Sequence, residues 1–442
     1  MSVPAYSAYR DSGVDWLGDL PATWRDVPFW ALFKRVKRSG FPDAELLSVY
    51  RDYGVIRKAD RDDNFNNASD DLGSYQLVEP GDLAINKMKA WQGSLGISPY
   101  RGIVSPAYFV YHARHAERPE YLHYLLRSVN YATGFMTISK GIRINQWDVD
   151  PDQLAKVRVP LPSVSEQSAI AAFLDRETAK IDALVEEQRR LIALLKEKRQ
   201  AVISHAVTKG LNPGAPMKDS GIEWLGEVPA HWGVGPVKRV IDLATSGPRG
   251  WSERASDDGA FFFQSQNIGR EMDGDFSQGA RVDVPDGPDA CRAKLKFNDI
   301  VVCITGGRTG SVAHISELPQ DAFVNQHVCL VRPTPTKGFG RYLSYGLFGL
   351  PGQEQLGLAM YGLKQGLSLE NVREIVLPFP PIAEQQAIAR FLDDRSTALL
   401  DLVNEAHLAI TLLQERRAAL ISVAVTGKID VRGLIPSQAE AA

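Results

Sequence analysis

The sequence predicts an α/β (α+β) protein in which two globular domains with irregular β-sheets are joined by two long helices. Two repeats carry this prediction. The phrase DSGVDWLGDLPATW at residues 11–24 returns as DSGIEWLGEVPAHW at 219–232, with nine of fourteen positions identical. Residues 160–208 return at 378–426, with 24 of 49 positions identical. Because the segments between these blocks have diverged, the chain is an internal tandem duplication with preserved ends and variable middles.

The variable middles predict strands joined by tight turns. Residues 81–97 and 298–315 are short apolar runs broken by glycine, and both place an aspartate before an aliphatic triplet. A Gly-Ser pair follows each aspartate eleven residues later, at 93–94 and 310–311. Residues 103–112 and 322–332 predict further strands. Two globular α/β domains follow from this pattern.

The repeated long blocks predict helices of about 43 residues, or about 60 Å. Ser163 and Glu166 have capping-box spacing at the start, and Gly210 supplies the stop. Apolar residues at spacings of three and four predict a seam formed by Leu174, Ile181, Leu184, Leu191, Leu195 and Val202, with partners Leu392, Leu399, Leu402, Ala409, Leu413 and Leu420. Two matched amphipathic helices favour packing on each other; the alternative is that each packs on its own globular domain.

These blocks set the expected boundaries of the domains. The predicted order is a leader and first globular domain at 1–158, a first long helix at 159–210, a leader repeat and second globular domain at 211–376, a second long helix at 377–430, and a flexible tail at 431–442.

Composition excludes several classes of protein. Three cysteines without a CxxC pair suit a reducing cytoplasm, and no apolar run reaches the roughly 18 residues of a membrane span. The net charge of −3 argues against a generic nucleic-acid binder. Acid-free stretches nevertheless occur at 83–116, 121–147, 322–353 and 355–369. They predict either a positive face on each domain or buried strands that exclude acids.

Motifs of catalysis are missing from the sequence. Residues 305–311 (TGGRTGS) lack the lysine of a phosphate-binding loop, and residues 233–238 lack the context of a dinucleotide fingerprint. No methyltransferase tetrapeptide or nuclease cluster is present. His112 and His115 have no third metal ligand nearby. The chain is therefore predicted not to be an enzyme by itself.

The two leaders, the PLP…EQ entry to each long helix and its AVT exit resemble the specificity (S) subunit of type I restriction–modification systems. INKMKAWQGS (85–94) and KQGLSLENV (364–372) are similar to segments of that family's target-recognition domains. The resemblance implies two such domains in inverted orientation, related by pseudo-twofold symmetry and held by an antiparallel coiled-coil helix pair. It also implies a non-catalytic role: each domain reads one half of a bipartite double-stranded DNA site.

Partners and cofactors follow from the same resemblance. The chain is expected to bind two methyltransferase (M) subunits that methylate adenine, and optionally two restriction (R) subunits that cleave unmodified DNA. It should hold no cofactor itself, whereas S-adenosylmethionine belongs to the M subunit and ATP with Mg to the R subunit. A bacterial or archaeal cytoplasm is the expected location, without a membrane partner.

Basic and amide side chains in glycine-bounded turns are candidates for DNA contact, because such groups reach base edges and phosphates. The candidates are Lys87, Lys89, Trp91, Gln92, Lys140 and Arg143 in the first domain, and Gln264, Gln266, Asn267, Arg308, Thr309, Lys364 and Gln365 in the second. For each of them, a solvated surface position is the alternative.

Two further questions stay open at this level. The leader tryptophans Trp16, Trp24, Trp224 and Trp232 are expected to be packing anchors where a leader meets the opposite helical end, with base stacking as the alternative. Two other functions also fit the pattern: a recognition subunit for a type II-like fused nuclease–methyltransferase, and a coiled-coil scaffold that binds protein.

Overall fold

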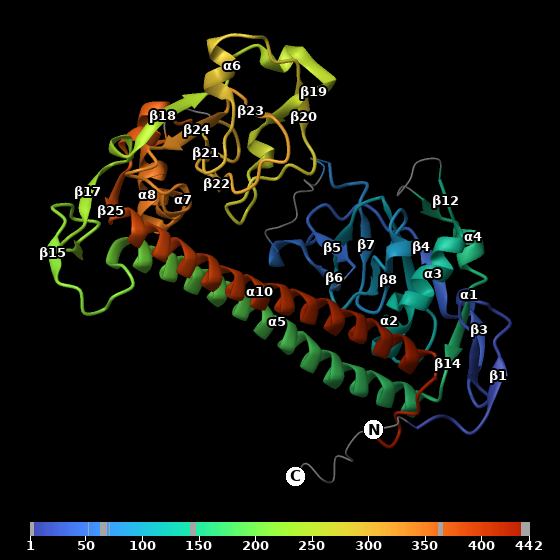
Figure 1. The fold of residues 1–442 in the computed structure, drawn as a ribbon. Coiled ribbons are helices and arrows are strands. Elements are labelled where there is room, and N and C mark those ends of the chain that lie inside the picture. Colours follow the sequence, from blue (N-terminus) through green and yellow to red (C-terminus); the bar gives the residue numbers. More distant parts are fainter. Residues whose placement is uncertain are drawn as a thin grey trace. The chain divides into compact units, whose positions relative to one another are not determined.

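The computed structural model describes residues 4–51, 53–61, 69, 71–141, 147–360 and 366–434. The chain divides into two compact units, one formed by Met1–Gln188 with His407–Ala442 and the other by Arg189–Ala406. Each unit holds one globular part of mixed helices and strands together with half of each long helix (Figure 1). None of the described helices combines the length and the apolar character needed to cross a membrane.

The two long helices are α5, Val164–Lys209 with 46 residues, and α10, Ile382–Val425 with 44 residues. The start of α5 and the end of α10 share the first unit, and the opposite ends share the second, so the helices run antiparallel (Figure 1). Arg417 Nε lies 2.9 Å from Asp182 Oδ1 across the pair. Ser163 caps the start of α5, and left-handed Gly210 follows its end. The predicted mutual packing is confirmed.

The seam between the helices differs in part from the predicted one. Leu174, Ile181, Leu195 and Leu392 are buried as expected. Val202, Leu399, Ala409, Leu413 and Leu420 are half-buried. The prediction is wrong at Leu184, Leu191 and Leu402, which are 44%, 42% and 47% exposed.

The buried positions lie one residue further along each helix. Val185 and Ile192 on α5 are each 7% exposed, and Val403 on α10 is also 7% exposed. Thr178 and Ser396, four residues after Leu174 and Leu392, complete the buried stripe. One residue turns a helix by about 100°, so the leucines beside these valines and isoleucines face away from the seam.

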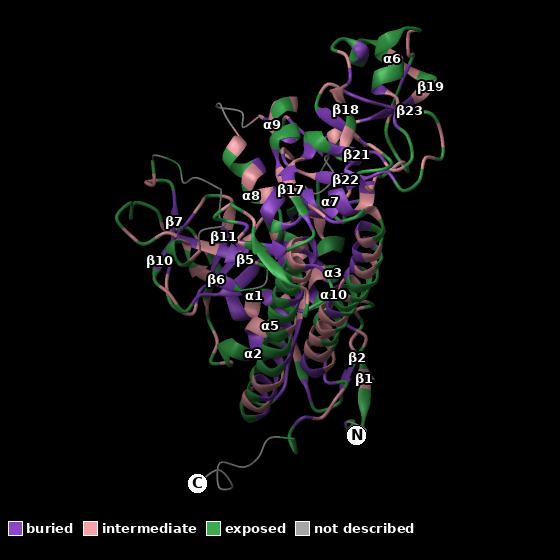
Figure 2. Ribbon diagram, turned by 60° about the vertical axis from the view of Figure 1, so that its left-hand side comes forward, coloured by how far each residue is buried: buried purple, intermediate pink, exposed green. Residues whose placement is uncertain are grey.

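Both globular parts contain a four-stranded antiparallel sheet with the same strand order. The strands in order across the first sheet are β4 (Phe33–Val36), β11 (Tyr108–Ala113), β8 (Leu83–Asn86) and β9 (Leu95–Ile97). Across the second sheet they are β18 (Ile241–Ser246), β24 (Val328–Pro333), β21 (Ile300–Cys303) and β22 (Val312–His314). The strands expected in the variable middles are confirmed. Figure 2 shows these sheets as mostly buried and the outer sides of the long helices as exposed.

The remaining elements form hairpins and short helices around the sheets. The first unit adds β1 (Tyr9–Asp11) paired with β2 (Asp19–Pro21), β3 (Arg25–Pro28) with β14 (Arg158–Leu161), β5 (Leu47–Tyr50) with β6 (Gly54–Arg57), β7 (Gln76–Val78) with β10 (Gly102–Val104), β12 (Ser139–Lys140) with β13 (Asp148–Val149), and helices α1 (Phe29–Leu32), η1 (Lys58–Asp60), η2 (Ala90–Gln92), α2 (Pro119–Arg127), α3 (Val129–Thr137) and α4 (Pro151–Leu154). The second unit adds β15 (Met217–Asp219) paired with β16 (Glu227–Pro229), β17 (Gly233–Pro236) with β25 (Val376–Phe379), β19 (Ala255–Phe263) between β20 (Ala280–Val282) and β23 (Ala322–Val324), and helices η3 (Val237–Arg239), η4 (Trp251–Arg254), η5 (Ser265–Asn267), α6 (Pro288–Ala293), α7 (Gly340–Phe348), α8 (Leu350–Ala359) and α9 (Leu369–Glu374).

The aspartates that the sequence repeats before β8 and β21 are buried supports of these sheets. Asp82 accepts a hydrogen bond from the guanidinium of Arg38 (2.6 Å), and His112 Nδ1 lies 2.9 Å from its other oxygen. Asp299 accepts two hydrogen bonds from the guanidinium of Arg332, at 2.8 and 2.7 Å. A buried carboxylate needs such partners. Asp82 therefore ties the start of β8 to His112 on β11 and to Arg38, just after β4. Asp299 ties the start of β21 to Arg332 on β24. The faint repeat in the middles is therefore structural.

A buried tyrosine joins the ends of both long helices in each unit. The hydroxyl of Tyr121 on α2 lies 3.0 Å from the carbonyl oxygen of Pro160, before α5, and 3.3 Å from that of Val425, at the end of α10. Tyr342 on α7 does the same in the second unit, 2.9 Å from the carbonyl oxygen of Pro378 and 3.2 Å from that of Val207.

A buried glutamine at the start of each long helix completes this junction. Gln167 and Gln385 accept a hydrogen bond from the backbone N–H that precedes α2 or α7, at 2.9 and 2.8 Å. Their amide groups donate to the carbonyl oxygens of Pro162 (3.0 Å) and Pro380 (2.9 Å).

We call the junction of leader hairpin, tyrosine helix and helix ends the mount. The first mount is formed by residues 9–24, 119–127, 158–170 and 420–427. The second is formed by residues 217–232, 340–348, 376–388 and 202–210.

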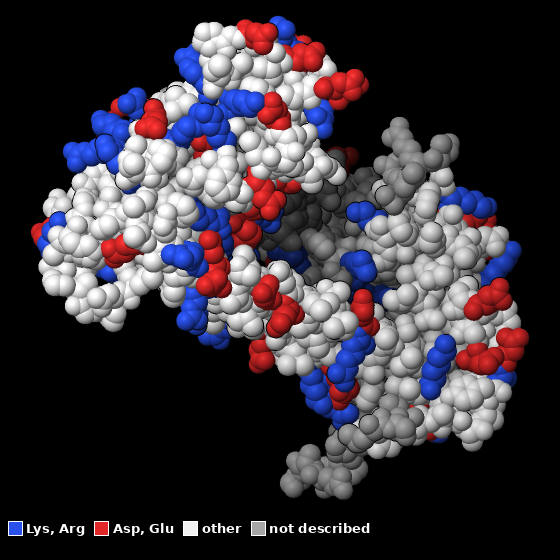
Figure 3. Space-filling model, in the orientation of Figure 1, with Lys and Arg blue, Asp and Glu red and all other residues white. Residues whose placement is uncertain are grey.

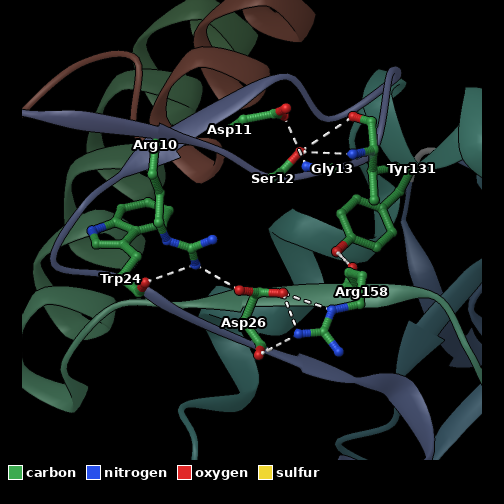
Figure 4. Close-up of polar contacts among 9 residues, drawn as sticks. Arg10, Asp11, Ser12, Gly13, Trp24, Asp26, Tyr131 and Arg158 are labelled. Carbon is green, nitrogen blue, oxygen red and sulfur yellow. Dashed lines mark hydrogen bonds and ion pairs between the residues drawn. The ribbon is translucent and has the colours of Figure 1, made fainter.

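An ionic cluster stiffens the first mount (Figure 4). Arg10 donates to Asp26 Oδ1 (2.5 Å) and to the carbonyl oxygen of Trp24 (3.0 Å), and Arg158 Nε donates to Asp26 Oδ2 (2.6 Å). Burial opposes ionisation of Asp26, yet the hydrogen bonds from both arginines outweigh it and the pKa of this carboxyl is lowered. Valines Val234 and Val376 take the places of Asp26 and Arg158 in the second mount, so the two copies reach the same geometry with different chemistry.

The leader tryptophans are packing anchors in three of four cases. Trp24 and Trp232 are buried beside the helix ends, which confirms the prediction for both. Trp16 packs instead against the ring of Tyr131 on α3, with ring centres 5.0 Å apart. The prediction is wrong for Trp224, which is 45% exposed.

The two buried tryptophans provide a matched test of one hydrogen bond. Trp24 Nε1 donates to Glu166 Oε1 (3.0 Å), whereas Trp232 Nε1 has no hydrogen-bond partner among the residues that the structure describes. We expect Trp24→Phe to lower the free energy of unfolding by about 1.5–3 kcal/mol more than Trp232→Phe, since both lose the same indole volume but only one loses a bond to a carboxylate. Denaturant unfolding of both variants measures this, and equal losses would contradict it.

Candidate nucleic-acid interface

The turn from β8 to β9 in the first unit carries four of the predicted residues. Trp91 is half-buried, and its Nε1 donates to the carbonyl oxygen of Met88 (2.9 Å). Left-handed Gly93 closes the turn. Lys89 is exposed and Gln92 is half-exposed on this frame. The tryptophan thus anchors the turn, and the lysine and glutamine are the groups that reach solvent.

A second predicted loop lies beside this turn. The ring centres of Trp91 and Trp147 are 5.3 Å apart, and the backbone N–H of Val149 donates to the carbonyl oxygen of Lys87 (3.0 Å). The β12–β13 hairpin is held there, with exposed Lys140 at 3.6 Å from Asp150. Arg143 lies outside the described residues. Loops that are about fifty residues apart in sequence therefore form one surface in the first unit.

Two predicted loops also meet in the second unit. Arg308, in the turn from β21 to β22, donates to the carbonyl oxygens of Gln266 (3.1 Å) and Ile268 in the η5 loop. Gln266 is exposed, and Gln264 is half-buried with its oxygen 3.3 Å from the Gln266 amide nitrogen. Arg308 is thus a positioning residue that fixes the two glutamines.

Asn267 has a structural role instead of the predicted surface role. It is buried, its amide group donates to the carbonyl oxygens of Asp275 (3.1 Å) and Gln278 (2.8 Å), and its oxygen accepts from the backbone of Gln264 (2.9 Å). A side chain whose hydrogen bonds are satisfied internally offers none to a base. The hydroxyl of Thr309 donates to the carbonyl oxygen of Gly306 (2.7 Å) within its turn.

Lys364 and Gln365 lie outside the described residues. The residues after them contact the Arg308 turn: the backbone N–H of Leu367 donates to the carbonyl oxygen of Ile304 (2.8 Å). Figure 3 shows lysine and arginine side chains gathered over the part of the second unit that contains β18 and β24.

Two basic residues that were not predicted join Lys87 in the first unit. Arg35 and Lys37, on and just after β4, line the same hollow as Lys87 at the end of the sheet. Their alternation with apolar Val36 in RVK is the period-2 signal of a strand that ends in solvent. That signal was available in the sequence, but the register that brings β4 near Lys87 was not.

Comparison with known proteins gives a consistent result. Residues 272–411 match the family model of the type I restriction modification DNA specificity domain. The chain is 23% identical over 378 residues to a putative type I restriction enzyme MjaX specificity subunit from Methanocaldococcus jannaschii, covering 82% of this chain and 81% of that protein. It is 21% identical over 439 residues to the type I restriction enzyme StySPI specificity subunit from Salmonella potsdam, covering 93% and 90%.

Solved structures share the fold. One, named "Structural basis underlying complex assembly and conformational transition of the type I R-M system", has a TM-score of 0.64 at 18% identity and covers 93% of this chain and 99% of its own. The HsdS subunit from Thermoanaerobacter tengcongensis has a TM-score of 0.51 at 17% identity, with 93% and 98% covered. The fold of two globular parts on a long helix pair is thus one that such chains have.

Proposed function

We propose, on the premise that this chain belongs to the family of type I restriction–modification specificity subunits, that each of its units reads one half of a bipartite DNA site. The family role is non-catalytic DNA recognition. The relatives named above are specificity subunits of type I systems, and neither alternative, a partner of a fused nuclease–methyltransferase or a protein-binding scaffold, is supported by them.

The observation that carries this proposal is that two equivalent mounts hold different turns. The tyrosine and glutamine bonds repeat between the units to within a few tenths of an ångström. The turns that follow β8 and β21 do not repeat: the first presents Lys89 and Gln92, whereas the second carries Arg308, which fixes Gln264 and Gln266 of the neighbouring η5 loop. A repeated scaffold with unlike polar turns suits the reading of two unlike half-sites.

The long helices are proposed to set the spacing of the half-sites and to dock the M subunits. Each helix exposes three leucines outside the seam: Leu184, Leu191 and Leu194 on α5, and Leu402, Leu408 and Leu412 on α10. Leu184 and Leu194 recur as Leu402 and Leu412 in the duplication. An exposed apolar row that is present twice favours two copies of one partner. S-adenosylmethionine in M, and ATP with Mg in optional R subunits, would supply the chemistry.

Methylome sequencing tests the proposal. A host that carries this chain with its M partner is expected to gain adenine methylation at one motif with two unequal halves and a fixed spacer. The chain expressed without M serves as the control and should produce none. A contiguous motif, or methylation by the chain alone, would contradict the proposal.

Arg308→Ala is expected to relax only one half-site. Without the guanidinium, the carbonyl oxygens of Gln266 and Ile268 lose their donor and the two glutamines lose their fixed position. Discrimination at one or more bases of that half should fall roughly tenfold, the order of a lost base contact. The matched control is Arg281→Ala, which also removes an arginine bonded to a carbonyl oxygen in this unit, that of Gly259 (3.0 Å). Equal relaxation of both halves would sink this prediction.

A further inference from the structure

A hollow of about 490 Å³ opens at the end of the first unit's four-stranded sheet. Its lining residues are Arg35, Val36, Lys37, Ser74, Gln76, Lys87, Pro106 and Tyr108. β4 and β8 lie on either side of β11 in this sheet, and Arg35, Lys37 and Lys87 come from the ends of these two strands. Three cations thus converge on one hollow from segments about fifty residues apart.

Aromatic and carbonyl groups hold two of these cations in place, and carboxylates do not. The guanidinium carbon of Arg35 lies 4.2 Å from the ring centre of Phe109, and Lys87 Nζ lies 4.9 Å from the same ring. Lys87 Nζ also donates to the carbonyl oxygen of Pro106 (2.5 Å). Among the described residues, no ion pair joins Arg35, Lys37 or Lys87 to a carboxylate.

The cations are close enough to act on one another. Burial lowers the pKa of Lys87, and the charges of Arg35 and Lys37 lower it further, while Asp148 opposes them. Like charges held together without ion pairs are at higher free energy than separated ones, and a bound anion relieves that repulsion. Ser74 adds an exposed hydroxyl to the lining. The hollow therefore offers donors and positive charge, which suit a phosphate oxyanion.

The second unit lacks these cations. Strand register makes Leu83 equivalent to Ile300 and Tyr111 to Val331, so Arg35 corresponds to Ala244. By the same count, Lys37 corresponds to Ser246 and Lys87 to Ile304. Since the mounts and both sheets are shared by the two units, a feature found in one alone is not required by the common scaffold. The cation hollow belongs to what distinguishes the first unit.

We propose that the Arg35–Lys37–Lys87 hollow binds one backbone phosphate of the DNA that the first unit recognises. This rests on the function proposed above and adds a defined phosphodiester contact to it. Such a contact fixes the position of the unit on the duplex and carries no base information. Lys87 contributes to it from the root of the turn that presents Lys89 and Gln92, so phosphate binding and base reading are mechanically linked.

Methylphosphonate scanning with the full S–M complex tests the proposal. A neutral methylphosphonate replaces one phosphate at a time in a duplex that carries the methylated motif. The parent complex should lose affinity when one linkage beside the first half-site is neutral. Lys87→Gln should no longer sense that linkage, and the slope of log affinity against log salt should fall by about 1. Both half-site sequences should stay unchanged.

Lys34→Gln is the matched control, because Lys34 is the exposed neighbour of Arg35 on the opposite face of β4. It should keep the parent's sensitivity at that linkage. If Lys87→Gln retains the full sensitivity and salt slope while the motif is still recognised, the hollow does not bind DNA and the inference is overturned. Stabilisation of the parent by inorganic phosphate, lost in Lys87→Gln with unchanged DNA scanning, would assign the hollow to a free anion and also overturn it. A parent complex that recognises no bipartite site overturns the proposed function and this inference together.

Discussion

Aspartate at both Val185 and Val403 is expected to abolish pairing of α5 with α10 and, with it, methylation of the bipartite site. The two valines occupy the same position in the two copies, and each is 7% exposed in the seam. A carboxylate placed there has no partner among the apolar residues that surround it. Each substitution should cost on the order of 3 kcal/mol or more, a large share of the stability of an ordinary domain. Thermal unfolding followed by circular dichroism, together with methylation of the motif, measures the effect.

The control lies one residue away. Leu184→Asp with Leu402→Asp adds the same charges at positions that are 44% and 47% exposed. This pair should unfold within a few degrees of the parent, because the seam is untouched. It should nevertheless bind M more weakly, since these leucines belong to the proposed docking row. If the leucine pair lowers the unfolding temperature as much as the valine pair, the seam described above is wrong.

The sequence could not decide which face of each long helix forms the seam, because apolar residues occur in adjacent pairs. Leu184-Val185 and Leu191-Ile192 each fit a spacing of three or four in either phase. Leucine was the more obvious choice, yet the β-branched residue of each pair is the buried one. Thr178, whose hydroxyl donates to the carbonyl oxygen of Leu174 (2.7 Å), is a polar residue in the buried stripe. It interrupts the apolar pattern that would otherwise have identified the buried face.

The mounts were largely predictable because the duplication marks them. Residues that are identical in the two copies, such as Gln167 and Gln385, are buried and hydrogen-bonded. Identity between the copies therefore indicates a structural role. One further repeat, YLHYLL at 121–126 against YLSYGL at 342–347, carries the tyrosines of the two mounts. Between the repeats this signal ends, which explains the weaker prediction of individual contact residues.

Candidate DNA contacts could be predicted as loops but not as single side chains. Gln264, Gln266 and Asn267 are chemically similar amides in one short stretch, and only the fold distinguishes the half-buried Gln264 and exposed Gln266 from Asn267, whose side chain is buried and hydrogen-bonded. Arg35 and Lys37 were missed because their neighbour Lys87 is fifty residues away, and proximity depends on strand register. Residue type therefore indicates what a side chain can bind, whereas the fold decides whether it is free to do so.

Lengthening both long helices by one heptad is expected to lengthen the spacer between the half-sites and leave both half-sites unchanged. α5 is about 70 Å long and connects the first mount to the second, and α10 makes the return connection. Seven residues add about 10 Å to a helix and, at 3.5 residues per turn, keep the seam in phase. At about 3.4 Å per base-pair step, the preferred spacer should grow by up to about three base pairs.

The insertions must lie level with each other to preserve the pairing of the helices. Asp182 and Arg417 face each other; because the helices are antiparallel, Arg190, eight residues after Asp182, is level with Ala409, eight residues before Arg417. The offset of 218 residues between the copies makes Arg190 equivalent to Leu408. Insertion between Arg190 and Leu191, and between Leu408 and Ala409, is therefore both level and equivalent in the two copies.

Insertion into α5 alone is the informative counterpart. The two helices would then differ in length by about 10 Å. If the seam stays in register, the end of one helix can no longer reach its place in the mount. Tyr342 needs the end of α5 and the strand before α10 at the same place, within 3.2 and 2.9 Å of its hydroxyl. The single insertion should therefore abolish methylation, whereas the double insertion should move it to the longer spacer. Methylome sequencing of both variants beside the parent decides the matter. New half-site letters with the original spacer would show that the helices read bases, and the assignment of recognition to the globular parts would be wrong.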